Sequence, residues 1–254
     1  MSRRFATRDG EVRALEGVSF DMRPGEFLSI VGPSGCGKST LVMLVAGLMA
    51  PSTGRIAIGG VTVTRPHTGL GIVFQSPVLL AWRRALDNVL LQLEMRDVAT
   101  APYRERARAL LASVGLAGFE DRYPHELSGG MRQRVALCRA LIHDPPLLLM
   151  DEPFGALDAL TRDQLVLDLQ RICARGQKSV LFITHSITEA VLLSDRVLVM
   201  TPRPGTIDTV LDIDLPRPRR LAIREDPRFA RYTRAIHERF VARGVLRDLE
   251  DEDA

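Results

Sequence analysis

The chain has 254 residues, of which 46% are hydrophobic and 26% charged. This is the balance of a globular protein with a buried core, which excludes a disordered or fibrous chain. Its three scattered cysteines fit neither a disulfide framework nor a metal site. No apolar run approaches the roughly 18 residues of a membrane-spanning helix, and the N-terminus is too polar for a signal peptide. We therefore expect a reduced, cytosolic, soluble protein.

Arginine dominates the basic residues. Only Lys38 and Lys178 are lysines among the 34 lysines and arginines. The net charge of +3 would suit a nucleic-acid-binding protein. We favour the alternative, a genome-wide preference for arginine codons, and the two remaining lysines then call for an explanation.

The first predicted strand covers residues 25–31, a short apolar run typical of a strand buried on both faces. The loop 32–39 fits G-x-x-x-x-G-K-[ST], and an apolar helix is predicted over 41–49. Glycines in such a loop let backbone N–H groups point at phosphate oxygens, and the helix adds its positive N-terminal end. Lys38 then reaches the β- and γ-phosphates of a nucleotide and Ser39 binds Mg²⁺, whereas the alternative is a glycine turn without function. The predicted nucleotide-binding residues are Gly32, Pro33, Ser34, Gly35, Cys36, Gly37, Lys38, Ser39 and Thr40.

The next segments change from strands to helices. Glycines and prolines separate two short strands, 55–58 and 61–64, in a predicted hairpin, and 70–74 is a further strand. Apolar residues then recur at helical spacing, with Gly115 placed to end one of the helices. We predict an all-helical insertion over 85–142.

A second glycine-containing segment begins a helix inside that insertion. Ser128, Gly129 and Gly130 offer a hydroxyl and two bare amides, which predicts an anion-binding surface. One nucleotide has no need of two such loops on one chain unless a second subunit supplies one of them. The alternative is a serine that caps a helix.

Strands return at 147–150, 179–184 and 196–201, separated by helical stretches, which predicts an α/β fold with a mainly parallel sheet. The first of these runs into Asp151 and Glu152. Ligands bind at the carboxyl edge of such sheets, so Asp151 is predicted to bind Mg²⁺ and Glu152 to act as general base on a water.

The tail contains eleven arginines over 203–247 and eleven acids over 208–253, so it is no one-sided basic arm. Asp226 and Pro227 are predicted to cap and begin a helix. Phe229, Tyr232, Ile236 and Phe240 follow at helical steps.

Together these motifs resemble the nucleotide-binding subunit of ABC transporters over nearly the whole chain. The resemblance implies a P-loop NTPase (RecA-like) core with a mixed, mainly parallel sheet, antiparallel strands and an inserted α-helical subdomain. It implies one domain, 1–254. The core would be 1–84 and 143–215, the helical signature subdomain 85–142, and a C-terminal helical tail 216–254.

Further residue roles follow from this resemblance alone. Gln75 matches the Q-loop, which contacts Mg²⁺ and water, and His185 matches the switch histidine, which contacts the γ-phosphate. Asp158 in Gly155–Asp158 matches the D-loop, which crosses the dimer interface. Phe5 resembles the aromatic that stacks on adenine, although the family has a further edge strand before it, so the start lies upstream or the sheet lacks that strand.

In the same family, Leu127–Arg134 matches the signature motif, whose Ser128, Gly129 and Gly130 contact the ATP of the opposite subunit. The implied cofactors are ATP and Mg²⁺. The implied partners are a second copy of the chain, integral-membrane permease subunits and an extracytoplasmic solute-binding protein, with no nucleic acid. The expected location is peripheral, on the cytoplasmic face of the cell (inner) membrane.

Residues 79–89, 200–205 and 215–219 are similar to importers of nitrate, taurine and aliphatic sulfonates, although Ala81 stands where that subfamily usually has proline. Trp82 would lie near the groove that receives the permease, or else in the core.

Three alternatives to this importer function stay open. The chain could serve uptake of another small solute, such as a pyrimidine precursor, it could be an ABC protein acting on nucleic acid, or it could be a P-loop kinase or GTPase.

Overall fold

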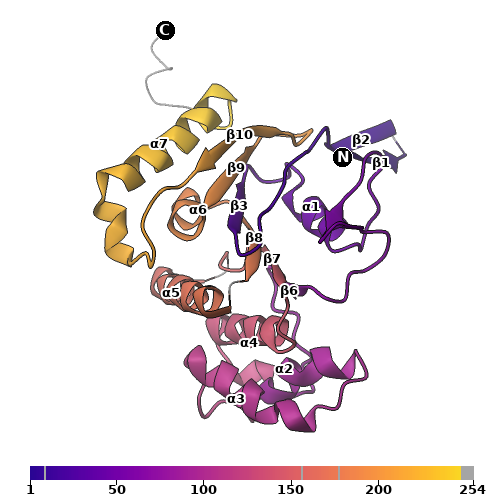
Figure 1. Ribbon diagram of the computed structural model, residues 1–254, viewed down its shortest axis with the longest axis vertical. Helices are drawn as coiled ribbons and strands as arrows, with labels where there is room; N and C mark the ends of the chain where they lie inside the picture. The colour runs from indigo at the N-terminus through magenta and orange to yellow at the C-terminus, as the bar shows by residue number, and fades with distance from the viewer. Residues whose placement is uncertain (9, 156, 177, 247–254) are drawn as a thin grey trace. The chain divides into compact units, whose positions relative to one another are not determined.

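The computed structural model describes residues 1–8, 10–155, 157–176 and 178–246 (Figure 1). Contacts within the chain divide it into two compact units, one formed by Met1–Thr68 with Leu181–Ala254 and the other by Gly69–Val180. In the described part of the chain, no helix combines the length and apolar character that crossing a bilayer requires.

A buried sheet with parallel and antiparallel pairings forms the centre of the first unit. Every residue of β3 (Phe27–Val31) is buried, which confirms the predicted strand. β9 (Arg196–Met200) runs parallel to β3, and β10 (Ile207–Asp212) pairs antiparallel with β9. On its other side β3 neighbours β8 (Ser179–Thr184), of which Leu181 onward belongs to this unit. The apolar runs near 179 and 196 therefore form strands as predicted.

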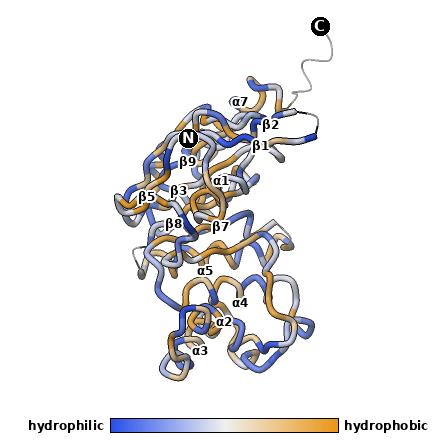
Figure 2. The backbone as a smooth tube through the Cα atoms, turned by 90° about the vertical axis from the view of Figure 1, so that its right-hand side faces the viewer, coloured by the Kyte–Doolittle hydropathy of each residue, from blue (hydrophilic) through white to orange (hydrophobic). Residues whose placement is uncertain are grey.

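Two small hairpins lie in the same unit. β1 (Arg3–Thr7) pairs antiparallel with β2 (Gly10–Leu15), a largely hydrophilic hairpin that the sequence analysis does not predict (Figure 2). β4 (Ala57–Ile58) pairs with β5 (Val61–Thr62), which confirms the predicted hairpin with shorter strands. Gly59 and Gly60 both have positive φ, 57° and 80°, as the tight turn between β4 and β5 requires.

The helices of the first unit begin and end at identifiable signals. α1 covers Lys38–Val45, so it begins and ends earlier than the predicted 41–49. Gly47 explains the early end, because its φ of +74° leaves the helical region. α6 covers Ile187–Leu193 and the short helix η3 covers Leu221–Glu225.

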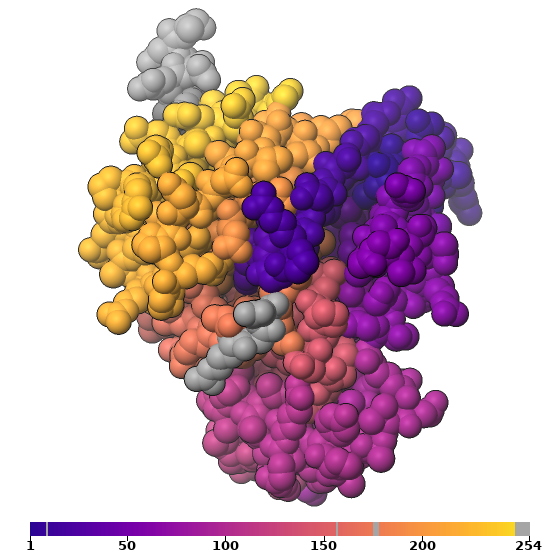
Figure 3. Space-filling model, viewed as in Figure 1, coloured from indigo at the N-terminus to yellow at the C-terminus, as the bar shows by residue number. Residues whose placement is uncertain are grey.

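The tail helix α7 covers Pro227–Ala242 and begins as predicted. The Asp226 side chain accepts a hydrogen bond from the Arg228 amide, and Pro227 is the first helical residue. Three of the four predicted apolar positions are buried, and Tyr232, the fourth, is half-buried with its hydroxyl donating to Asp214. Figure 3 shows α7, in yellow, on the molecular surface beside the orange β10 segment.

Arginines of the tail bind backbone oxygens within the first unit. Arg219 is 2% exposed, and its guanidinium donates to the carbonyls of Val191, Leu192 and Ser194 at the end of α6. Burial lowers the pKa of Arg219 to about 10. Arg217 likewise donates to the Leu193 carbonyl oxygen at 2.6 Å, and it also donates to the Asp195 carboxylate. These arginines thus have a structural role that codon preference alone does not describe.

The second unit combines two parallel strands with helices. β6 (Gly71–Val73) pairs with β7 (Leu147–Asp151). A Cβ at Gly71 would lie 2.5 Å from the Ala140 carbonyl oxygen, so a helix packs directly on the strand backbone there. The helices are α2 (Ala85–Glu94), η1 (Ala101–Tyr103), α3 (Arg104–Ser113), η2 (Pro124–Glu126), α4 (Gly129–Leu141) and α5 (Ala159–Gly176).

Helices α2, α3 and α4 pack against one another within the segment predicted to be helical (Figure 1). Gly115 follows α3 with a φ of +73° and ends it as predicted. α2 and α4 bury apolar side chains such as Val89, Leu90 and Val135 at 1% exposure or less. Burial at this spacing is what the helical periodicity indicates.

Lys178, which the sequence does not explain, joins two chain segments of the second unit. Its ammonium donates to Asp144 Oδ1 at 2.6 Å and to the Pro145 carbonyl oxygen at 3.1 Å, and the residue is 9% exposed. Asp144 has a φ of +57°, and the Lys178 hydrogen bond lowers its pKa. Lys178 therefore fastens the turn before β7 to the start of β8.

Lys178→Met is expected to destabilise the protein by about 1–3 kcal/mol, because the Pro145 carbonyl loses its buried donor. For a chain of this size, calorimetry should record a melting temperature lower by about 2–10 °C. The control is Arg106→Met, which removes a second, half-exposed cation from Asp144. It should change stability by less than about 1 kcal/mol. Equal melting temperatures for Lys178→Met and the wild-type chain would refute the structural role.

Candidate functional site

The phosphate-binding loop lies between β3 and α1 in the first unit. Gly35 and Gly37 have φ values of +77° and +105°, which other residues rarely adopt. A Cβ at Gly37 would also lie 2.6 Å from Leu15 Cδ2 and 2.9 Å from the Ala14 carbonyl oxygen. No side chain caps the start of α1 at Gly37. The loop therefore leads into a helix N-terminus suited to an anion.

Lys38 lies along this loop. It is 5% exposed, and its ammonium donates to the carbonyl oxygens of Gly32 at 2.9 Å and Pro33 at 3.0 Å. Ser39, next along the chain, is exposed. These contacts hold a compact cation at the loop that the motif assigns to phosphates.

A second loop of the first unit supports the phosphate loop. Arg203 donates from Nε and Nη2 to the Gly35 carbonyl oxygen, at 3.2 and 3.1 Å. A Cβ at Gly205 would lie 2.0 Å from the Cys36 carbonyl oxygen, so only glycine fits there. In the sequence, Arg203 and Gly205 indicate only the subfamily resemblance, and nothing there predicts this contact. The Arg-Pro-Gly sequence signals a turn, but it does not say what the turn touches.

His185 is exposed at the end of β8, and its neighbours fix its backbone. The Thr184 hydroxyl donates to Glu189 Oε2 at 2.6 Å and accepts from the Ser186 amide at 2.9 Å. Ser186 in turn caps α6 by accepting from the Glu189 amide. The imidazole therefore stands at a rigid junction of strand and helix.

Phe5 lies on β1 and is half-buried. The Arg3 guanidinium lies 4.6 Å from the centroid of its ring. One face of the ring thus holds a cation–π contact. A base that stacks on Phe5 would need the opposite face.

In the second unit, the structure brings Gln75 and Glu152 together. Asp151 ends β7 and is 9% exposed, and Glu152 follows it with a φ of +45°. The Gln75 side-chain amide donates to Glu152 Oε2 at 3.3 Å. A glutamate held in left-handed backbone is strained, and such strain is concentrated at functional sites. The sequence predicts both residues, but it signals neither their contact nor the strain.

The segment at the start of α4 has the geometry of a capped helix. The Ser128 hydroxyl accepts from the Met131 amide at 3.2 Å, as the structural alternative predicts. Ser128 and Gly129 are exposed, whereas Gly130 is buried and a Cβ there would lie 2.5 Å from Thr161 Cγ2. Gly130 therefore allows α4 and α5 to pack closely, and only the first two residues present polar groups at the surface.

Asp158 is exposed just before α5. Its Oδ1 accepts from the Thr161 amide at 3.0 Å, and this hydrogen bond lowers the pKa of the carboxyl. Leu160 beside it is 83% exposed. Ala156, in the same predicted motif, lies outside the described residues.

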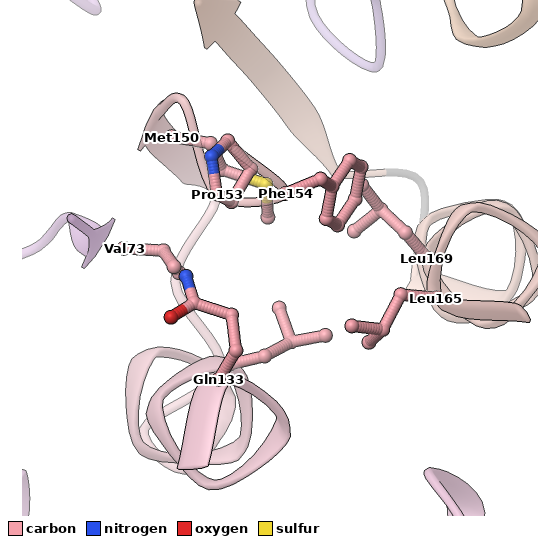
Figure 4. A pocket seen from close by; sticks show the side chains of 8 residues that line it. Val73, Gln133, Met150, Pro153, Phe154, Leu165 and Leu169 are labelled. Carbon is pink, nitrogen blue, oxygen red and sulfur yellow. The ribbon is translucent and has the colours of Figure 1, made fainter. Parts of the chain in front are cut away.

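A small pocket in the second unit is lined by residues of β6, β7, α4 and α5, and Figure 4 shows the Gln133 side chain at its edge, with the amide turned toward Val73. The amide of Gln133 donates to the Phe74 carbonyl oxygen at 3.1 Å. The remaining lining residues are apolar: Val73, Leu137, Met150, Pro153, Phe154, Leu165 and Leu169.

The chain belongs to the ABC transporter family. The family model described as "ABC transporter" matches residues 15–155, more than half of the sequence. The predicted family is thereby confirmed, and the chain is an ATP-binding, ATP-hydrolysing subunit of this family.

The curated relatives include proteins named for import. The taurine import ATP-binding protein TauB of Burkholderia pseudomallei (strain K96243) is 45% identical over 246 residues, which cover 93% of this chain and 93% of that protein. The nitrate import ATP-binding protein NrtC of Synechococcus elongatus is 47% identical over 224 residues, 87% of this chain but 34% of that protein.

The fold matches that of a solved ABC cassette. The dimeric structure of the ATP-binding cassette MJ0796 in a post-hydrolysis state, bound to ADP and Pi, has a TM-score of 0.75 and 30% identity. The match covers 84% of this chain and 96% of that one. This confirms the predicted P-loop NTPase fold with its mixed, mainly parallel sheet.

Proposed function

We propose that this chain hydrolyses ATP to drive import of a small anionic solute such as nitrate, taurine or an aliphatic sulfonate. The phosphate loop carries the proposal, because its glycine backbone and the Lys38 ammonium form an anion site at the start of α1. The solute class is supported by the relatives named for taurine and nitrate import. Uptake of another small solute, such as a pyrimidine precursor, is the alternative.

The phosphate loop, Gly32–Thr40, binds the triphosphate, and Phe5 stacks on the adenine. The proposed Mg²⁺ ligands are Ser39 in the first unit and Gln75 and Asp151 in the second, which would offer the ion hydroxyl, amide and carboxylate oxygens. When bound, the ion neutralises charge on the β- and γ-phosphate oxygens.

Hydrolysis depends on side chains outside the phosphate loop. Glu152 accepts a proton from the attacking water, and the hydrogen bond from Gln75 supports its orientation. His185 donates toward the γ-phosphate from the end of β8, where the contacts of Thr184 and Ser186 fix the backbone.

A second copy of the chain completes each site. Ser128 and Gly129 present a hydroxyl and an amide at the exposed start of α4, with Gly130 behind them, and these groups contact the ATP of the opposite copy. Asp158, exposed ahead of α5, lies at the interface of the two copies. The dimeric form of the related cassette supports this arrangement.

The chain works beside integral-membrane permease subunits and an extracytoplasmic solute-binding protein, peripherally on the cytoplasmic face of the membrane. Trp82 is 74% exposed and Val78 59% exposed, which excludes a core position for Trp82 and supports a docking role for these two apolar side chains.

We assign the chain one ABC ATPase domain, with a core of 1–84 and 143–215, a helical subdomain of 85–142 and a tail of 216–254.

Uptake and phosphate release test this function together. The purified chain should release phosphate from ATP only with Mg²⁺, and vesicles that also hold the permease and binding protein of the same system should accumulate nitrate, taurine or an aliphatic sulfonate. Accumulation of a different solute would favour the alternative. Salt-dependent binding to DNA or RNA, or phosphorylation of a small acceptor, would contradict the importer proposal.

A further inference from the structure

Two buried side chains of α4 hold the segment that carries Gln75. Arg139 donates from Nη1 to the Val78 carbonyl oxygen and from Nη2 to the Pro77 carbonyl oxygen, both at 2.7 Å. Gln133 donates to the Phe74 carbonyl oxygen at 3.1 Å. The three accepting carbonyls flank Gln75 on both sides. We call these three hydrogen bonds the α4 clamp.

The clamp holds a conformation that the segment does not favour by itself. Val78 has a φ of +45°, which a β-branched residue rarely adopts. Arg139 is 8% exposed, and burial lowers its pKa. An arginine remains charged even so, and its planar fork matches two carbonyl oxygens better than a lysine would. Two short hydrogen bonds to the Gln75 segment compensate for removing the Arg139 charge from water.

We propose that Gln133 and Arg139 are positioning residues that keep the Gln75 side chain hydrogen-bonded to Glu152. The inference rests on the proposed function of Gln75 and Glu152, whose side chains are 3.3 Å apart. Because the carbonyls on both sides of Gln75 are fixed to α4, the Gln75 side-chain amide can reach only a limited set of positions relative to the end of β7.

The clamp also ties Gln75 to the start of α4. Ser128 caps this helix at its first turn, and Gln133 and Arg139 lie further along the same rigid element. A displacement of the exposed Ser128 end therefore moves the Gln75 segment with it. Contact of that end with a second copy's nucleotide would thereby be transmitted to the Glu152 carboxylate.

Arg139→Met tests the clamp, since it keeps side-chain length and removes both donors. We expect kcat for ATP to fall at least about tenfold while ATP affinity stays within about twofold, because Lys38 and its loop are untouched. Hydrogen exchange of the amides in 74–80 should become faster. Arg139→Lys, which keeps the charge with a single compact donor group, should restore part of kcat.

Lys178→Met is the matched control. It also removes a buried cation from a backbone carbonyl in the second unit, but none of its hydrogen bonds reaches the Gln75 segment. Its melting temperature should be lower than that of the wild-type chain while its kcat stays near the wild-type value. This result would separate a positioning role from an effect on general stability. An equal loss of kcat in both variants would overturn the proposal, as would a folded Arg139→Met with wild-type kcat.

Two further results keep the outcome decisive. If Arg139→Met does not fold, Gln133→Leu, which removes only the bond to Phe74, should lower kcat at least about threefold, and an unchanged kcat would overturn the proposal. If the wild-type chain hydrolyses no ATP, the proposed function fails. In that case unchanged hydrogen exchange at 74–80 in Arg139→Met would refute the clamp separately.

Discussion

Glu152→Gln is expected to bind ATP as the wild-type chain does and to lose most of its turnover. The amide has the shape of the carboxylate and still offers an oxygen to the Gln75 donor, but it does not accept a proton from water. Loss of a general base lowers turnover by about 10²–10⁴-fold. Steady-state phosphate release and equilibrium binding of a fluorescent ATP analogue measure the two effects.

Glu105→Gln is the control for this change, because Glu105 is an exposed glutamate of the same unit that pairs only with Arg108 in the described contacts. It should hydrolyse ATP at the wild-type rate. Turnover of Glu152→Gln within a few-fold of wild type would show that Glu152 is not the base. A parallel loss of ATP affinity would point instead to a role in binding.

Lys38→Ala is expected to weaken ATP binding itself. Charge-assisted hydrogen bonds contribute about 1.5–3 kcal/mol, which corresponds to an affinity loss of about 10–150-fold. The Gly32 and Pro33 carbonyls that hold the ammonium lose their donor in the same variant. Isothermal titration with ATP and Mg²⁺ measures the loss.

Lys38→Arg provides a sharper comparison at the same position. Its charge is retained, but the longer planar fork does not fit between the two carbonyls and the phosphates as a compact ammonium does. It should therefore bind ATP more weakly than the wild-type chain. Wild-type affinity in both Lys38 variants would contradict the assignment of the loop.

The sequence predicts the parts of the site that local chain geometry determines. A phosphate loop needs consecutive residues between one strand and one helix, so Gly37 and Lys38 are recognisable without any tertiary information. An apolar strand that ends in acids likewise identifies Asp151 and Glu152. The buried face of α7 follows from the helical spacing of Phe229, Ile236 and Phe240, and the start of the helix follows from the Asp226 cap.

Long-range contacts account for what the sequence does not predict. Lys178 meets Asp144 across 34 residues, and Arg139 meets Val78 across 61, and no periodicity encodes such pairs. The positive φ of Glu152 depends on the surrounding chain, because only tertiary structure holds a glutamate there. The N-terminal hairpin is missed because its strands are short and polar, so its alternation is weak.

Dimer formation by Glu152→Gln is the most direct test of the proposed mechanism, in which two chains enclose two ATP molecules. For Glu152→Gln, sedimentation velocity should record a monomer without nucleotide or with ADP. With ATP it should record a dimer, which persists because this variant hydrolyses ATP slowly. Lys38→Ala should remain monomeric under all three conditions. A Glu152→Gln chain that binds ATP and still sediments as a monomer would contradict the ATP-enclosing dimer.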